Sequence, residues 1–368
     1  MLHSPLFGIR GCWNSPTAGA GAFGAVLAAL ASLLIAFSPS AQAQTTITPV
    51  MSAAAAPVGA ETIRFGILPL GGVAESRNDW MPLLLSLGQS VQRPVSVLSV
   101  TSYEALDQAI HRNQVDMAFL SGKMALDTVT RGQMKVIAQV SRHDGLPGYR
   151  ALLLMRQAGP LNRLDDMLAA PGRWRLARGG PLSLSGFIVP KLQLFLPHHV
   201  AMETAFASEM VGTHQTMALA VANGEADVAT NNTADFERFR LQFPAEAARL
   251  KVVWASDLIA HAQLLVRRDM PPDLVQRLQT FLVTYAQVQG AQGEAERAVL
   301  KSLHNLAAFV PADNQSLLPA ARLAWQLARQ SAIEGQWVSE AARQTRLDSL
   351  DATFKAQQMV LRGDPAKP

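Results

Sequence analysis

The stretch GGPLSLSGFIVP, Gly179–Pro190, places two serines on either side of a leucine, between a pair of glycines and an apolar run. The apolar run predicts a buried helix that begins near Ser183. Such a helix start has two readings. The serine caps the helix and does nothing more, or the free N–H groups and the positive end of the helix dipole form a seat for an anion. Ser185 would add a second hydroxyl to that seat, and Gly186 would let the backbone approach closely.

Segments on both sides of this stretch alternate between strand-like and helix-like patterns. Strand-like runs such as RPVSVLSV and KVIAQVSR alternate with amphipathic runs such as SYEALDQAIHRNQ, and the rhythm resumes after HDGLPGYRALLLMR. This alternation predicts helices packed on mostly parallel sheets. A chain of 368 residues is too long for one typical core. We therefore expect an α/β fold of two lobes joined by two crossing strands. From PPDLVQRLQTFLVTYAQ onward the pattern is almost wholly helical.

The N-terminus has the three parts of a secretory signal. Arg10 precedes the apolar run Ala22–Phe37, and Ala41, Gln42 and Ala43 follow it. Cleavage after Ala43 would release the mature chain into the periplasm, and the alternative is a permanent membrane anchor. The predicted organisation is a signal peptide (1–43), a flexible leader (44–61), the first part of lobe 1 (62–150), lobe 2 (151–258), and a return to lobe 1 with extra C-terminal helices (259–368).

Composition argues against several classes of function. The net charge is +4 and no basic block is present, which speaks against nucleic-acid binding. The single cysteine, Cys12, lies in the predicted signal, and the chain has no H-E-x-x-H or G-x-S-x-G motif. We predict no catalytic residues, no cofactor and no metal; a fortuitous metal site at the adjacent His198 and His199 is the weaker reading.

Polar residues in the loops after predicted strands are candidates for ligand binding, because ligands of open α/β sheets bind at the carboxyl ends of strands. Tyr103 in TSYEAL, His214 in GTHQT and Asn232 in TNNT occupy such loops. Each also has a structural reading: a packing tyrosine, a structural histidine and a turn-forming asparagine.

Taken together, the motifs resemble the phosphonate-binding periplasmic proteins of ABC importers, the PhnD-like branch of the type 2 solute-binding proteins. The matching pieces are RFGILP, DGLPGY, LSGFIVP, THQTMALAVANG and DVATNNT, and the similarity runs from Ile63 to about Leu264. The resemblance implies a two-lobed fold whose cleft closes on a phosphorus oxyanion and delivers it to an inner-membrane ABC permease. Carried over by position, the ligand-binding residues are Ser183, Leu184, Ser185, His214, Tyr103, Leu120 and Asn232.

The chain also departs from that family pattern. Leu184 replaces a threonine of the seat, and Leu120 replaces a second tyrosine. Ala234 and Ala262 stand where the family's aminoalkylphosphonate binders have acids, and Asp257 and Asp235 are nearby but out of register. We therefore expect no carboxylate to pair with a ligand's ammonium group, and burying that charge unpaired is costly. The expected ligands are phosphate, phosphite, methylphosphonate or a phosphonate with an apolar tail, rather than 2-aminoethylphosphonate.

Two other functions stay open at this point. The same fold could serve as an extracytoplasmic sensor that reports ligand occupancy to a membrane signalling system, or as an enzyme on the same scaffold. The C-terminal helices, which carry Trp325 and Trp337 among alanines, either pack on a lobe or form a homodimer face.

Overall fold

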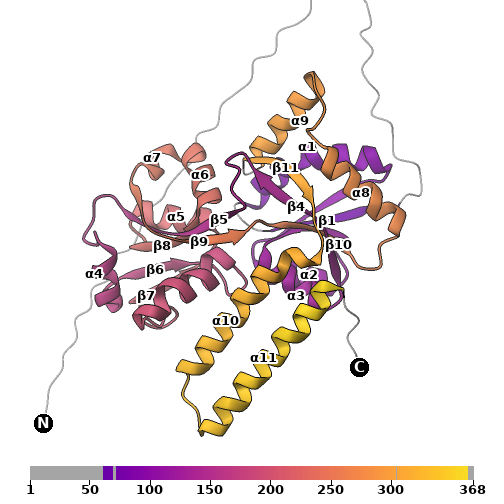
Figure 1. Ribbon diagram of the computed structural model, residues 1–368. Coiled ribbons are helices and arrows are strands. Elements are labelled where there is room, and N and C mark those ends of the chain that lie inside the picture. Colours follow the sequence, from indigo (N-terminus) through magenta and orange to yellow (C-terminus); the bar gives the residue numbers. More distant parts are fainter. Residues whose placement is uncertain (1–60, 69–71, 304, 364–368) are drawn as a thin grey trace, which may run out of the picture. The chain divides into compact units, whose positions relative to one another are not determined.

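The computed structural model describes residues 61–68, 72–303 and 305–363 (Figure 1). The predicted signal peptide and residues 44–60 of the predicted leader lie outside the described residues. The described part contains two β-sheets, one of six strands and one of five, with helices packed around them. This is the two-lobed α/β architecture that the sequence predicted. No helix within the described ranges is long and apolar enough to cross a membrane.

Six strands form the first sheet: β1 (Ile63–Ile67), β2 (Val95–Ser99), β3 (Met117–Leu120), β4 (Met134–Arg142), β10 (Gln263–Arg267) and β11 (Leu306–Pro311). Their order is β11-β4-β10-β3-β1-β2. β1 pairs in parallel with β2 and β3, but β10 and β11 pair in antiparallel fashion with their neighbours. The expectation of mostly parallel sheets is therefore wrong here, because the chain re-enters this sheet from the second one in the opposite direction.

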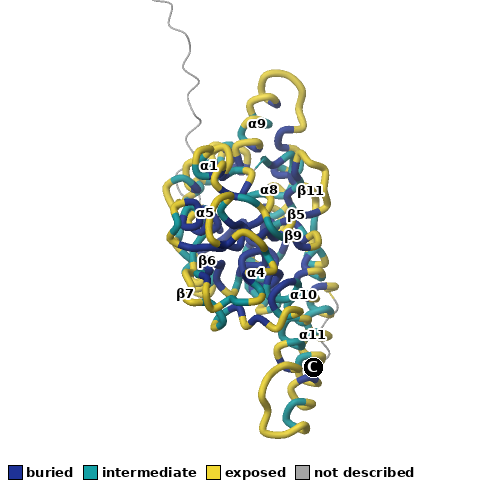
Figure 2. The backbone as a smooth tube through the Cα atoms, turned by 90° about the vertical axis from the view of Figure 1, so that its left-hand side faces the viewer, coloured by how far each residue is buried: buried dark blue, intermediate teal, exposed yellow. Residues whose placement is uncertain are grey.

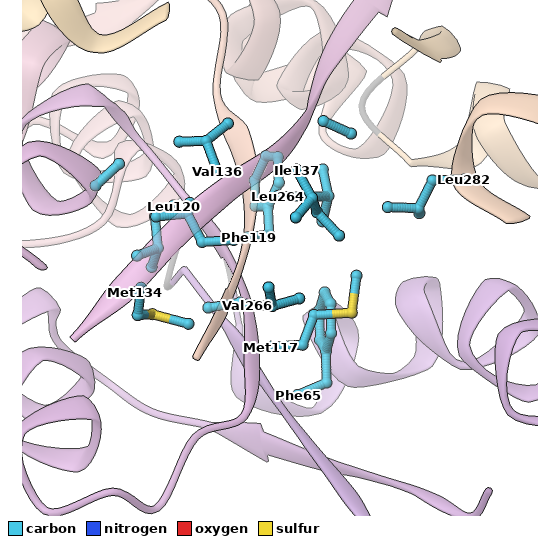
Figure 3. Packing of buried hydrophobic residues seen from close by; sticks show 14 of the residues in the cluster. Phe65, Met117, Phe119, Leu120, Met134, Val136, Ile137, Leu264, Val266 and Leu282 are labelled. Atoms are coloured by element: carbon cyan, nitrogen blue, oxygen red, sulfur yellow. The ribbon is translucent and has the colours of Figure 1, made fainter. Parts of the chain in front are cut away.

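Helices cover the first sheet: α1 (Val73–Val91), α2 (Tyr103–His111), α3 (Gly122–Thr130), α8 (Pro272–Thr284) and α9 (Ala291–Ser302). Trp80 of α1 is fully buried, and its ring lies 5.1 Å from that of Phe65 and 4.9 Å from that of Phe119. Figure 3 shows Phe65, Met117 and Val266, from three neighbouring strands, gathered in this core. α8 begins at Pro272, because the first turn of a helix does not need the N–H that proline lacks.

Five strands form the second sheet: β5 (Gly148–Arg156), β6 (Arg175–Arg178), β7 (Ser208–Val211), β8 (Val228–Asn232) and β9 (Leu250–Ala260). Their order is β7-β6-β8-β5-β9, with β6 parallel to β7 and β8, and β5 antiparallel to β8 and β9. The accompanying α-helices are α4 (Leu164–Ala169), α5 (His214–Asn223), α6 (Thr233–Gln242) and α7 (Pro244–Ala247). The chain enters this sheet between β4 and β5 and leaves it between β9 and β10.

The two sheets carry matching ion pairs. In the first sheet, Asp116 accepts hydrogen bonds from the backbone N–H of Arg64 (2.9 Å) and from its guanidinium (2.7 and 2.8 Å). In the second, Asp227 accepts the same three bonds from Arg175 (2.9, 3.0 and 2.9 Å). Both pairs span 52 residues of sequence. The two sheets thus share a structural detail.

The C-terminal region differs from its prediction as almost wholly helical. Strand β11 interrupts it and pairs with the edge of β4, which supplies hydrogen-bond partners that no local pattern reveals. After it, α10 (Leu318–Glu334) and α11 (Glu340–Arg362) form a hairpin. Trp325 stacks on Phe354 at 4.9 Å and donates to Asp351 across this hairpin. Most residues around its turn are exposed (Figure 2).

Candidate functional site

A pocket of about 60 Å³ lies where the loops at the ends of strands from both sheets meet. Polar or ionisable side chains supply part of its lining: Tyr103, Ser121, Arg142, Tyr149, Ser183, Ser185, His214, Asn232, Asp235 and His261. The rest is apolar: Leu68, Phe119, Val140, Leu184, Ala234, Ala262 and Leu306. A small cavity that combines a few converging polar groups with an apolar wall is typical of a ligand site.

The helix that follows the glycine pair begins at the pocket. It runs without interruption from Leu184 to His198, and we call it the seat helix. Ser183 caps it, because its Oγ accepts a hydrogen bond from Gly186 N at 3.0 Å. A Cβ on Gly186 would lie 2.8 Å from the Cα of Gly179, so the close approach of these two segments requires glycine. The predicted helix start is therefore confirmed.

The winding of the seat helix differs from the α-helix that its pattern suggests. Its segments η2 (Leu184–Ile188) and η3 (Lys191–Phe195) are π-helical, and η4 (Leu196–His198) is a 3₁₀ turn. π-Helical turns are uncommon and occur often at functional sites. Ser183, Leu184 and Ser185, at the start of this helix, all line the pocket.

Three buried side chains converge on one point, and we call them the donor cluster: Ser185, His214 and Asn232. Ser185 Oγ lies 3.2 Å from His214 Nε2 and 3.2 Å from Asn232 Nδ2. His214 is the first residue of α5, and Asn232 is the N-cap of α6. Burial lowers the pKa of His214 below its usual value, although the charge of Asp235 opposes this. The imidazole is therefore neutral at neutral pH, and the cluster consists of neutral hydrogen-bonding groups.

Two tyrosines face the serines of the seat helix. Burial raises the pKa of Tyr103, while hydrogen bonding to Ser183 acts the other way. Burial likewise raises the pKa of Tyr149, and there Ser185 is the opposing partner. Both phenols therefore stay protonated and can donate to an anion. Tyr149 was not predicted as a site residue, although it ends the quoted motif DGLPGY.

Asp235 places a carboxylate in the pocket lining, although its register in the sequence spoke against this. It lines the pocket, and its side chain is only 10% exposed. Its Oδ2 accepts a hydrogen bond from Asn232 Nδ2 at 2.7 Å and lies 3.9 Å from His214 Nε2. Its backbone N–H in turn donates to Asn232 Oδ1 at 2.8 Å. This reciprocal cap at the start of α6 turns the carboxylate toward the donor cluster. The alignment of the sequence with the family motif did not indicate this orientation.

Arg142 and His261 are the other ionisable lining residues that the sequence did not indicate. Arg142 Nη2 lies 3.0 Å from Glu237 Oε2 of α6. His261 Nε2 lies 3.0 Å from the carbonyl oxygen of Leu146, and burial lowers its pKa. The lining around them, Val140, Ala262 and Leu306, is apolar. Ala262 occupies the position at which the family's aminoalkylphosphonate binders have an acid, and it contributes an uncharged side chain to the pocket lining.

Six of the seven predicted site residues line the pocket: Tyr103, Ser183, Leu184, Ser185, His214 and Asn232. Leu120 does not. It is fully buried in the core of the first sheet, whereas its neighbours Phe119 and Ser121 line the pocket. Successive side chains of a strand point to opposite faces, which explains this alternation. Lys123 pairs with Asp127 on its own helix instead of lining the pocket.

Leu184 has neighbours other than the donor cluster. Its Cδ1 would lie 2.6 Å from a Cβ placed on Gly122, and Ala320 of α10 packs at the same point. The side chain therefore fills apolar space between the seat helix, α3 and α10. In the described ranges no group of three or more His, Cys, Asp or Glu side chains could hold a metal ion.

Comparisons with known proteins find similarity to periplasmic proteins that bind phosphonate or import phosphate. Residues 65–317 match the family model of the periplasmic substrate-binding protein of phosphonate ABC transporters. The chain is 28% identical over 313 residues to the phosphonates-binding periplasmic protein of Escherichia coli, covering 83% of this chain and 90% of that protein. It is 25% identical over 245 residues to the phosphate-import protein PhnD of Mycolicibacterium smegmatis, covering 64% and 75%.

A solved structure extends this similarity to the fold. The binding-protein component of an ABC phosphonate transporter from Pseudomonas aeruginosa superimposes with a TM-score of 0.76 at 28% identity. The match covers 82% of this chain and 98% of that one.

Proposed function

Because this chain belongs to the family of periplasmic substrate-binding proteins of phosphonate ABC transporters, we propose that it captures a small phosphorus oxyanion and delivers it to an inner-membrane ABC permease. The observation that carries the proposal is the meeting of Ser183, Ser185, His214 and Asn232 with two protonated tyrosines in one buried pocket. Each hydrogen bond to a charged group contributes about 1.5–3 kcal/mol. Several such donors together hold an oxyanion without a lysine.

The size of the pocket favours a small ligand. One water needs about 10–15 Å³ of such a cavity, so about 60 Å³ accommodates a ligand of roughly five non-hydrogen atoms. Phosphate and methylphosphonate have that size, and phosphite is slightly smaller. The relative from Mycolicibacterium smegmatis is named for phosphate import, which supports including phosphate.

Hinge closure is the mechanism we propose. The lobes are residues 62–150 with 259–368, and residues 151–258, and they pivot about Tyr149–Leu153 and Leu258–Val266. These segments include the strands by which the chain passes between the sheets. The pocket lining comes from both lobes, so a ligand favours the closed form by the difference between its affinities for the two forms.

Export and assembly complete the proposal. The family is periplasmic and acts as a solute-binding component of a transporter. For this chain we propose export by the signal peptide 1–43 with cleavage after Ala43, no catalytic activity, and a homodimer face on the C-terminal helices.

Calorimetric titration of the mature protein tests the proposal. Phosphate, phosphite, methylphosphonate and 2-aminoethylphosphonate are titrated separately into the wild type and into Ser183→Ala. We expect saturable binding of at least one small oxyanion and weaker binding by the variant. Ser349→Ala, at an exposed position of α11, is the control and should bind as the wild type does. If none of the four ligands bound, the proposed function would be wrong.

A further inference from the structure

The carboxylate of Asp235 lies inside the region where the oxyanion's oxygens would bind. Its Oδ2 is 2.7 Å from Asn232 Nδ2 and 3.9 Å from His214 Nε2. Ser185 Oγ is within 3.2 Å of those same two nitrogens. Any ligand oxygen that these donors hold is therefore a close neighbour of a carboxylate.

A fully ionised oxyanion is poorly suited to this position. Two negative charges at such a distance in a buried pocket repel each other strongly. His214, the titratable member of the donor cluster, does not offset this repulsion, because burial lowers its pKa and keeps its imidazole neutral near neutral pH. A carboxylate is also only an acceptor, so it cannot donate to an ionised oxygen.

A ligand that carries its own proton removes the conflict. We propose that Asp235 accepts a hydrogen bond from the P–OH group of a singly protonated phosphorus oxyanion and thereby selects that form. No proton is transferred: the ligand hydroxyl donates a hydrogen bond, and the Asp235 carboxylate accepts it. The inference rests on the proposed function, since it assigns a specificity-determining residue to the same pocket. It predicts rejection of sulfonates, which cannot hold a proton near neutral pH.

An ammonium group would be the other partner for this carboxylate. The position of Asp235 argues against it, because Oδ2 lies among the hydrogen-bonding groups that would hold the ligand's oxygens. The apolar part of the lining, including Phe119, Val140 and Ala262, is where a ligand's substituent can be accommodated.

Other ionisable groups around Asp235 do not produce the expected pH dependence. They are His214 on α5, Tyr103 on α2, Tyr149 on β5, Arg142 on β4, His261 between β9 and β10, and Glu237 with Arg238 on α6 itself. Burial lowers the pKa of both histidines and raises that of both tyrosines. Above neutral pH the two histidines and the two tyrosines therefore stay uncharged. The group whose protonation changes in this range is the ligand.

The test is a pH series with methylphosphonate and methanesulfonate. For the wild type we expect the apparent Kd for methylphosphonate to rise about tenfold per pH unit above the second pKa of the ligand, because only the protonated fraction binds. Methanesulfonate should not bind. In the ³¹P NMR spectrum, bound methylphosphonate should keep the shift of the monoanion to a higher pH than free ligand does.

Asp235→Asn removes the charge while its amide oxygen still accepts from Asn232. We expect this variant to lose the pH dependence and to gain binding of methanesulfonate, because an asparagine N–H donates to an ionised oxygen. Asp165→Asn, at an exposed position of α4, is the matched control. If thermal unfolding shows that Asp235→Asn is misfolded, Asp235→Ser takes its place. The NMR measurement of bound methylphosphonate uses the wild type alone and does not depend on either variant.

Several results would overturn the inference. Binding of methylphosphonate that does not change with pH, or a bound ligand that NMR shows as the dianion, would refute it while leaving the proposed function intact. Tighter binding of 2-aminoethylphosphonate than of ethylphosphonate, lost in Asp235→Asn, would make Asp235 the ammonium partner instead. Absence of any phosphorus oxyanion binding in the wild type would refute the proposed function and this inference together.

Discussion

Arg142 Nη2 lies 3.0 Å from Glu237 Oε2, and this ion pair joins strand β4 of the six-stranded sheet to helix α6 beside the five-stranded sheet. Glu237 Oε1 also accepts a hydrogen bond from Asn305 at 3.0 Å. On the same helix, Arg238 pairs with Glu75 at 3.1 Å and with Asp79, both of α1. Helix α6 therefore carries charges of both signs that bind residues of strand β4, of helix α1 and of the segment before β11.

Glu237→Gln should weaken ligand binding by about two- to fivefold, because partly exposed ion pairs contribute up to about 1 kcal/mol. The contact between strand β4 and helix α6 loses a charge pair, and Arg142, which lines the pocket, loses one of its partners. Calorimetric titration with the preferred oxyanion at low and high salt measures the effect, which should shrink as salt screens the pair. Glu340→Gln, whose partner Arg343 is on the same helix, is the control. Equal affinities of Glu237→Gln and wild type would contradict the prediction.

Ser185→Ala should reduce affinity by roughly 10- to 150-fold, which corresponds to about 1.5–3 kcal/mol for a hydrogen bond to a charged group. The serine also holds His214 and Asn232 in position, so its loss loosens the whole donor cluster. Titration of phosphate and methylphosphonate gives the ratio of affinities. A variant that binds as tightly as Ser349→Ala would show that the ligand binds elsewhere.

Leu184→Thr restores the family's hydroxyl but should destabilise the protein by about 1–3 kcal/mol. The leucine is 2% exposed and packs beside Gly122 and Ala320, so a shorter polar side chain leaves unfilled space there. Urea unfolding followed by circular dichroism measures the change. Leu241→Thr, at a residue that is 81% exposed, should have almost no effect. A Leu184→Thr variant as stable as the wild type would mean that this packing contributes little.

Asp227→Asn should lower the free energy of unfolding at neutral pH by about 1–3 kcal/mol, because it removes charge from a hydrogen-bonded ion pair. Hydrogen bonds from Arg175 hold the pKa of Asp227 below its ordinary value, against the effect of burial. The folded-state pKa is therefore lower than the unfolded one. The resulting stabilisation is complete above about pH 4 and is lost as the pH falls through the folded-state value.

Urea unfolding at neutral pH and below about pH 3 separates this contribution from others. The wild type should lose more stability on acidification than Asp227→Asn does. Asp165→Asn, at an exposed site, should follow the wild type at both pH values. Equal acid sensitivity of the wild type and Asp227→Asn would refute the prediction.

Local patterns in the sequence were sufficient for several features of the site. Neighbouring residues along the chain determine where a helix begins. The structure contains the helix start at Ser183, between the glycine pair and the apolar run, and the cap of α5 at Thr213. Tyr103 and His214 each begin the helix that follows a strand and its loop. These positions follow from the alternation of strands and helices. Six of the seven predicted residues line one pocket for this reason.

Features that depend on distant partners could not be predicted in this way. Strand β11 exists because β4 offers it an open edge, and the π-helical winding of the seat helix has no signature that we recognised in its sequence. Asp235 was judged by its register in a motif, but the cap at Asn232 turns its carboxylate into the pocket. Arg142 enters the lining because Glu237, 95 residues later, pairs with it.

The amino-acid sequence alone determined the α/β class and the helix start that presents Ser183 and Ser185, because periodicity, caps and glycine requirements act between near neighbours. The family followed from the resemblance of its motifs. Folding in three dimensions decided which charges face the ligand, because a side chain's surroundings are set by segments far away in the chain. The carboxylate of Asp235 beside His214 is the clearest case: 21 residues separate them along the chain, and 3.9 Å separate their polar atoms in the pocket.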